Sequence, residues 1–367
     1  MEAQVFPRQQ PPPVQRPPAD NPQGHPPGLP DPDLSKLEGA PKPGELPTFE
    51  FRSGFWTNLH HFLYEQALLR RDRTNVAIGG GAEDARAVFV PVSTQLSSQE
   101  QRDWDSAVDY YTRNLASKDL LQNGDMVAIN NVLATLGGCS ELAGRSNPRC
   151  TSGLQPAMID ALTAAAPVYR AHWWPADDRA NHEWISKTSG LIAKWGTDIS
   201  QQLSATYSAP WPVAHIIVDV VSYGGPFGAY TSLDPLHITI SSCDPRNQGG
   251  GGLAGFEVLF HEASHSLAAN VSRAISEECR RRGKLIPRDL WHAVLFYTTG
   301  EIVLREISAQ TPKDSPQLKD YQPYGARYGL YERGWANYLQ VLQTYWQPYL
   351  DGQLTFDVAV SRMVAAL

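Results

Sequence analysis

The chain has 367 residues, which is enough for one large domain or two of ordinary size. Apolar residues make up 42% of it, close to the share of a globular protein, and the formal charge of −7 argues against nucleic acid as a partner. The short basic run at 280–282 stands at the expected end of a helix, where cations suit the helix dipole. No apolar run approaches about 18 residues, so we expect no membrane span.

The first 47 residues hold about half of the 29 prolines, with Gln, Gly and Asp between them. This composition buries too little apolar surface to order itself, so we predict a disordered tail over 1–47. The tail has neither a basic start nor an apolar central segment, and it is therefore not a signal peptide. We divide the remainder into a helical N-terminal part, 48–208, and a second part, 209–367, which we expect to form one compact unit.

Apolar residues at helical spacing predict that residues 50–208 are almost entirely helical. The adjacent His60 and His61 face different directions on the first helix, so we interpret them as packed or polar helix residues, with a role in a binding site as the alternative. Trp173 and Trp174 fall between two helices and predict a packed joint, again with a binding-site role as the alternative. Residues 87–92 fit a short strand or an extended linker. The predicted helices span 55–71, 97–116, 126–136, 155–172 and 175–207, the last with a weak point at Gly190 or Gly196.

Beta-branched residues predict strands at 214–221, 229–231 and 236–241. His237 and Thr239 alternate with isoleucines, so one face of the last strand should be polar and the other packed. We expect His215 and His237 on the sheet surface rather than at a metal site. A glycine-rich loop at 249–252 then leads into the next helix. The expected fold class is α+β and mostly helical.

The next helix contains His261-Glu262-Ala263-Ser264-His265, an H-E-x-x-H motif within an apolar run. Histidines at positions i and i+4 lie on one helix face, where two neutral imidazoles can bind one Zn²⁺ ion at about 2.0–2.1 Å each. Glu262 points roughly 100° around the helix, so it can flank the ion without binding it and take a proton from the attacking water. The motif predicts a zinc site with His261 and His265 as ligands and Glu262 as general base.

A catalytic zinc site needs one more protein ligand. We expect the motif helix to continue to residue 282 and a second helix, 287–308, to run back beside it. At about 1.5 Å per residue, Glu301 then returns close to the level of His265, so we predict Glu301 as the third ligand. The alternatives for this position are Glu306 and His292. The structural interpretation of Glu301 is a salt bridge with Arg305, one turn further on.

This combination resembles the gluzincin zinc metallopeptidases, which pair H-E-x-x-H with a glutamate on a following helix. The resemblance covers about residues 214–308 and matches His261, Glu262, His265 and Glu301. It implies a zincin-like fold, in which a small sheet lies beside the motif helix and an antiparallel helix bears the glutamate. Many gluzincins place an aspartate four residues after the third ligand, where this chain has Arg305.

Gluzincins generally also supply a downstream Tyr or His that stabilises the oxyanion. The resemblance implies Tyr328 in this role here, with Tyr324, Tyr331 and Arg327 as alternatives. We accordingly expect a zinc-dependent endopeptidase acting on peptides or proteins. The alternatives are an aminopeptidase or another zinc hydrolase on the same site, and a non-catalytic binding protein with a structural metal or none.

The four cysteines form no C-x-x-C pair, so a cysteine zinc site is not indicated. We predict disulfides between Cys139 and Cys150 and between Cys243 and Cys279, with free thiols as the alternative. Disulfides imply an oxidising compartment, so we expect a secreted or periplasmic protein.

Overall fold

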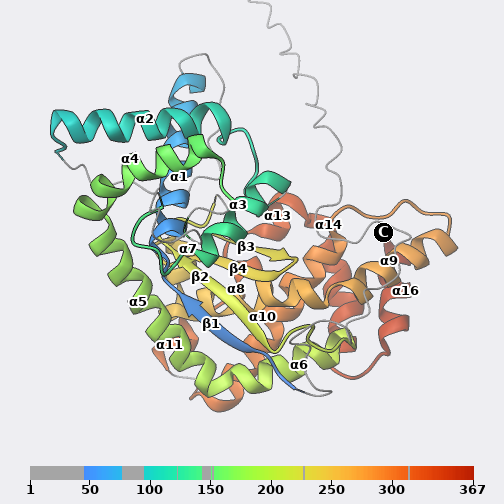
Figure 1. The fold of residues 1–367 in the computed structure, drawn as a ribbon. Coiled ribbons are helices and arrows are strands. Elements are labelled where there is room, and N and C mark those ends of the chain that lie inside the picture. The colour runs from blue at the N-terminus through green and yellow to red at the C-terminus, as the bar shows by residue number, and fades with distance from the viewer. Residues whose placement is uncertain are drawn as a thin grey trace, which may run out of the picture.

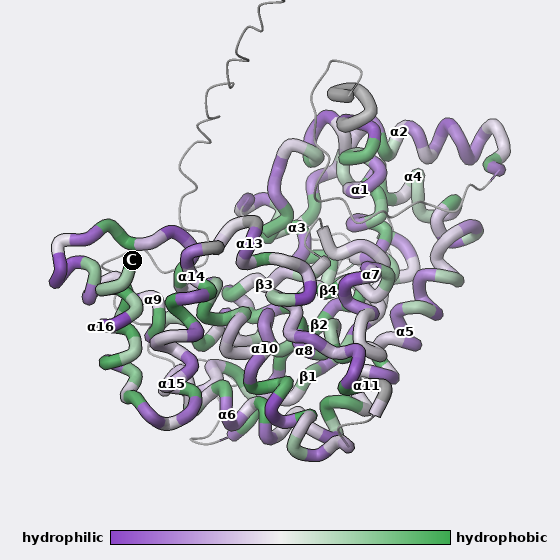
Figure 2. The backbone as a smooth tube through the Cα atoms, turned by 180° about the vertical axis from the view of Figure 1, so that it is seen from behind, coloured by the Kyte–Doolittle hydropathy of each residue, from purple (hydrophilic) through white to green (hydrophobic). Residues whose placement is uncertain are grey.

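The computed structural model of the protein describes residues 45–76, 95–121, 123–142, 150, 153–225, 228–312 and 315–367. They form a mostly helical α+β fold with one mixed sheet of four strands, as the sequence predicts. Figure 1 shows the sheet near the centre of the molecule, and Figure 2 shows hydrophobic and hydrophilic residues alternating along the helices that surround it. The predictions for residues 1–44 and 87–92 lie outside the described residues.

The sheet has the strand order β1-β2-β4-β3. Strands β1, β2 and β4 are parallel to one another, and β3 pairs antiparallel with β4 at the edge. The N-terminal strand β1 pairs with β2 although no strand was predicted there, since a five-residue segment gives little local signal. The strands span Thr48–Arg52 (β1), His215–Val221 (β2), Ala229–Leu233 (β3) and Leu236–Ser241 (β4).

The two faces of the sheet differ in chemistry, and both are buried. One face presents Asp219, His237 and Tyr230 toward helix α1, Phe55–Val76, where His61 Nε2 lies 2.7 Å from the Tyr230 hydroxyl. The opposite face is mainly apolar and packs against helix α8, Leu253–Ser264. The prediction that His237 lies on the surface is wrong, because α1 covers the polar face and leaves His237 4% exposed and paired with Asp219 at 2.9 Å. His215 is exposed, as predicted.

Four helices of the N-terminal half pack around their own hydrophobic cluster. The predicted helix positions agree to within a few residues, and Ser97 and Glu100 form the capping box that begins α2. His60 and His61 are fully buried, and the ring centroids of Trp173 and Trp104 lie 4.6 Å apart. The predictions that these histidines and Trp173 are packed side chains are therefore confirmed. These helices are Phe55–Val76 (α1), Ser98–Asn114 (α2), Gly124–Thr135 (α3) and Pro156–His172 (α4).

The long helical segment after α4 is interrupted close to Gly190 and Gly196. Helix α5 spans Trp174–Leu191, a π-helical turn (η3) spans Ile192–Gly196, and α6 spans Thr197–Tyr207. The predicted weak point is therefore a π-turn between two α-helical segments, which bends the helix without ending it.

The motif helix does not run straight to residue 282 as predicted. Helix α8 spans Leu253–Ser264, a 3₁₀ turn (η5) spans His265–Leu267, and α9 spans Ala269–Arg281. Every residue of α8 is buried, which suits a helix enclosed between the sheet and helix α10, Leu290–Gln310. The short α7, Pro245–Gln248, and η4, Gly250–Gly252, precede α8.

Short helices close the chain after α10. The last helix, α16, spans Phe356–Ala366. The preceding segments are Pro316–Lys319 (α11), Tyr324–Arg327 (α12), Leu330–Gly334 (α13), Ala336–Val341 (α14), Leu342–Trp346 (η6) and Gln347–Leu350 (α15). None of the helices in the described ranges combines the length and apolar character needed to cross a bilayer.

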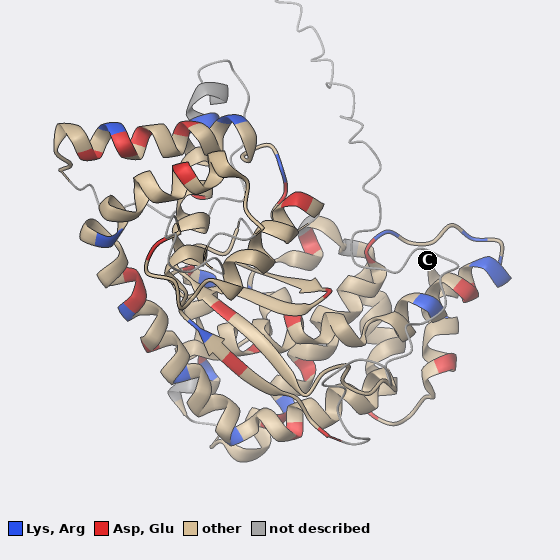
Figure 3. Ribbon diagram, in the orientation of Figure 1, with Lys and Arg blue, Asp and Glu red and all other residues tan. Residues whose placement is uncertain are grey.

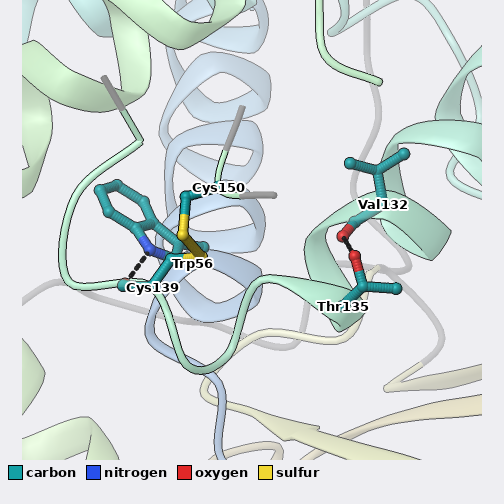
Figure 4. The surroundings of a disulfide bond; sticks show 5 residues. All are labelled: Trp56, Val132, Thr135, Cys139 and Cys150. Atoms are coloured by element: carbon teal, nitrogen blue, oxygen red, sulfur yellow. Dashed lines mark hydrogen bonds between the residues drawn. A yellow bond between two sulfur atoms is a disulfide. The ribbon is translucent and has the colours of Figure 1, made fainter. Parts of the chain in front are cut away.

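One of the two predicted disulfides is present. Cys139 and Cys150 are joined, and the Trp56 indole donates a hydrogen bond to the Cys139 carbonyl at 2.7 Å (Figure 4). Cys243 and Cys279 are free, so the second predicted pairing is wrong. The reason is their location: Cys279 lies in the core of the second half, whereas Cys243 follows β4 and lies near the buried Asp177 of α5 and Glu65 of α1.

Candidate metal centre

Three histidines converge at the junction of α8 and α10. One side-chain nitrogen from each of His261, His265 and His292 lies within 4.8 Å of the other two. His261 comes from the last turn of α8, His265 begins the 3₁₀ turn, and His292 lies on the first turn of α10. No other group of His, Cys, Asp or Glu in the described part of the chain has this geometry.

The closest nitrogen pair in the group fits a shared ion. The Nε2 atoms of His261 and His292 are 3.2 Å apart. Two nitrogens at about 2.0–2.1 Å from a tetrahedral zinc ion lie roughly 3.3–3.4 Å from each other. A single ion can therefore bind both imidazoles with little movement of either helix.

The three imidazoles are in the protonation state that metal binding requires. Burial lowers the pKa of His261 and His265 well below the ordinary value, and it lowers the pKa of His292 to about 4. The neighbouring histidines lower the first two pKa values further. Neutral imidazoles keep the nitrogen lone pair that a metal ion accepts.

Aromatic packing orients these rings. The ring of Phe296 stacks on His261 with centroids 3.5 Å apart, and Trp291 meets His265 edge-on at 5.7 Å. The Nδ1 atoms of His261 and His265 are buried without a hydrogen-bond partner among the residues that the structure describes. Ring packing, rather than a hydrogen bond from Nδ1 to a carboxylate or carbonyl, therefore orients these two imidazoles.

Glu262 lies beside the histidine group and is not part of it. The Thr231 hydroxyl on β3 donates to Oε2 of Glu262 at 2.6 Å, and this oxygen lies 3.8 Å from Nε2 of His265. Burial raises the pKa of Glu262 to about 7, while the hydrogen bond from Thr231 acts in the opposite direction. The carboxyl group can therefore exchange a proton near neutral pH.

The structure does not bring Glu301 into the group. Glu301 lies nine residues after His292 on α10, about 13.5 Å further along the helix axis. Its charged neighbours are Arg305 and Asp351, and burial raises its pKa. Glu306 accepts a hydrogen bond from Gln202 and is likewise not part of the histidine group. The histidine group instead contains His292, which the sequence indicated as an alternative third ligand.

Tyr328 is also directed away from the histidines. Its hydroxyl donates to the Arg246 carbonyl at 3.1 Å, and its ring packs 4.7 Å from Tyr324. Tyr324 in turn stacks on Phe296, the ring that covers His261. Tyr328 is thus separated from His261 by two aromatic rings.

Thr231 is a polar neighbour of Glu262 that the sequence did not predict. It lies on β3, 31 residues before Glu262, and only the packing of β3 against α8 brings the two together. The strand itself was predicted, but a threonine in a strand has an ordinary structural role and gave no signal.

No known protein family, curated protein or solved structure matches this chain.

Proposed function

We propose that His261, His265 and His292 bind a zinc ion and that the protein is a zinc-dependent peptidase. The observation that supports this most is the convergence of three neutral imidazoles beside a buried carboxyl group that binds none of them tightly. Three histidines are an established ligand set of catalytic zinc sites. The resemblance to gluzincins then extends to the H-E-x-x-H residues but not to the third ligand, which is a histidine here.

Each residue of the site has a distinct role in this proposal. The bound ion would act as a Lewis acid toward the scissile carbonyl and the attacking water. Glu262 accepts the proton of the water and passes it to the leaving amine. Thr231 holds the carboxylate in place through its hydrogen bond to Oε2.

The substrate class follows from the neighbouring sheet edge. Strand β3 is the terminal strand of the sheet, runs antiparallel to β4, and carries Thr231 against Glu262. An extended peptide can add to such an edge through backbone hydrogen bonds, which do not depend on side-chain identity. We therefore propose peptide or protein substrates and a zincin-like arrangement of β3, α8 and α10. The Cys139–Cys150 disulfide is compatible with an extracellular location for this activity.

The test begins with the metal content of the purified protein and with activity before and after treatment with a chelator. Glu262→Gln should retain zinc and lose roughly 10²–10⁴-fold in kcat. Peptides with free and with blocked N-termini distinguish an aminopeptidase from an endopeptidase. Full activity of Glu262→Gln with zinc bound would disprove the role of Glu262, and a protein without any metal would disprove the site.

A further inference from the structure

The connection between α9 and α10 exposes two adjacent apolar side chains. Leu285 is 94% exposed and Ile286 is 59% exposed, whereas no other large hydrophobic residue in the described ranges exceeds 40%. Residues 284–287 have no regular secondary structure. Exposure of two neighbouring aliphatic side chains to water is unfavourable, so burial of the pair against another surface would lower the free energy.

Basic residues stand on both sides of this apolar pair. The basic residues are Arg280, Arg281, Arg282, Lys284 and Arg288. The acidic residues in the same stretch are Glu277, Glu278 and Asp289. Figure 3 shows basic segments at the end of α9 and on the connection that follows it. Glu278 accepts hydrogen bonds from Arg281 and Arg282, and Arg288 pairs with Asp289 at 3.3 Å. Residues 277–289 nevertheless carry a net positive charge in a chain with a formal charge of −7.

The segment is fixed to the closing helices at both ends. Nζ of Lys284 donates to the carbonyls of Val364 and Ala365 at 3.0 and 2.8 Å. The hydroxyl of Tyr338 donates to the carbonyl of Arg288 at 2.6 Å. These bonds hold the two apolar side chains at a defined place between the cations.

We propose that residues 280–288 dock the protein on an anionic lipid bilayer, with Leu285 and Ile286 inserted among the headgroups. Exposed aliphatic side chains between cations are the chemistry that binds proteins to such surfaces. A folded protein partner is a poorer fit, because two side chains supply only a fraction of the roughly 1,200–2,000 Å² that a stable protein interface buries. This inference is independent of the proposed function, since docking needs neither a metal ion nor activity.

Vesicle flotation of the full chain tests the proposal. The vesicles contain phosphatidylcholine alone or phosphatidylcholine with about one third phosphatidylglycerol, a charge density that attracts basic segments. Two double variants separate the contributions: Leu285→Ser with Ile286→Ser, and Arg280→Gln with Arg288→Gln. The matched controls are Val358→Ser, which is 38% exposed on α16, and Arg113→Gln, whose side chain is 76% exposed on α2.

We expect binding to the acidic vesicles only, reduced by about tenfold or more in each double variant and retained in both controls. High salt should weaken it, because exposed charges are screened. Absence of wild-type binding to acidic vesicles overturns the proposal, as does equal binding by the Leu285→Ser, Ile286→Ser variant. Retention on immobilised polyglutamate, without vesicle binding and dependent on the same residues, would assign the segment to an acidic protein instead.

Discussion

The Thr231 hydroxyl lies 2.6 Å from Oε2 and 2.9 Å from the backbone carbonyl of Glu262. This one side chain on the edge strand therefore fixes both the carboxyl group and the last turn of α8. We predict that Thr231→Val lowers kcat by roughly 10–100-fold, as expected for loss of a hydrogen bond to a charged group. KM and zinc content should change little, and Thr231→Ser should restore most of the activity. Equal activity of the valine and serine variants would remove the hydroxyl from the proposed mechanism.

The ligand set predicted from the sequence and the one indicated by the structure differ by a single residue and can be separated directly. His292→Ala should weaken zinc binding by more than the roughly 10–100-fold that outer-shell substitutions cause. Glu301→Gln should leave the zinc affinity unchanged, because Glu301 lies about 13.5 Å further along α10. Competition with a chromophoric chelator measures both affinities. A loss of zinc affinity in Glu301→Gln but not in His292→Ala would instead identify Glu301 as the third ligand.

The buried Glu65 gives a pH dependence of stability that is unrelated to the metal centre. Burial, and then the nearby Asp177, raise the pKa of Glu65 to about 9. A carboxyl group whose pKa is higher in the folded state favours folding while it is protonated, and this contribution is lost as the pH rises from about 4.5 toward 9. Glu65→Gln removes the ionisation. We expect its melting temperature to exceed that of the wild type at pH 8 and the difference to shrink toward pH 5.

Thermal unfolding at several pH values measures this difference. If Glu65→Gln lowers the melting temperature by the same amount at every pH, the prediction is contradicted. Such a result would show only a loss of packing.

Gly255 allows α8 to approach its neighbours closely. A Cβ atom on Gly255 would lie 2.5 Å from the Asn247 carbonyl and 3.0 Å from Nε1 of Trp184. Gly255→Ala should therefore lower the free energy of unfolding by about 1–3 kcal/mol, as overpacking does. The matched control is Gly190→Ala on α5, where a Cβ meets nothing within 4 Å. It should raise stability by up to about 1 kcal/mol, because alanine favours the helix. Denaturant titration distinguishes them, and equal effects would contradict the close approach.

Local signals in the sequence were sufficient for most elements. The capping box of Ser97 and Glu100 begins α2, and the β-branched run after residue 213 forms β2. The burial of His237 was not predictable in this way, because it depends on α1 covering the polar face of the sheet. Thr231 was missed for the same reason, since its partner comes from a packing contact and not from a spacing.

The sequence ranked His292 below Glu301 because of an assumption about the return path of the chain. From His265 to residue 282 the chain moves about 25 Å at helical rise, and the prediction let a second helix cover the way back. In the structure, a 3₁₀ turn at His265–Leu267 interrupts the motif helix, and residues 284–287 have no regular secondary structure, so the geometry of two straight helices does not apply. The first turn of α10 brings His292 beside His261 and His265, and Glu301 lies further along the helix.

The sheet also has a consequence for how the chain folds. Thr48 of β1 and His215 of β2 are neighbours in the sheet although 167 residues separate them in the chain. Most of the polypeptide must therefore be synthesised before β1 can pair with β2. Contacts between residues this far apart in the chain also form slowly, because a long loop must close first. We expect the N-terminal strand to be among the last parts to acquire its native hydrogen bonds.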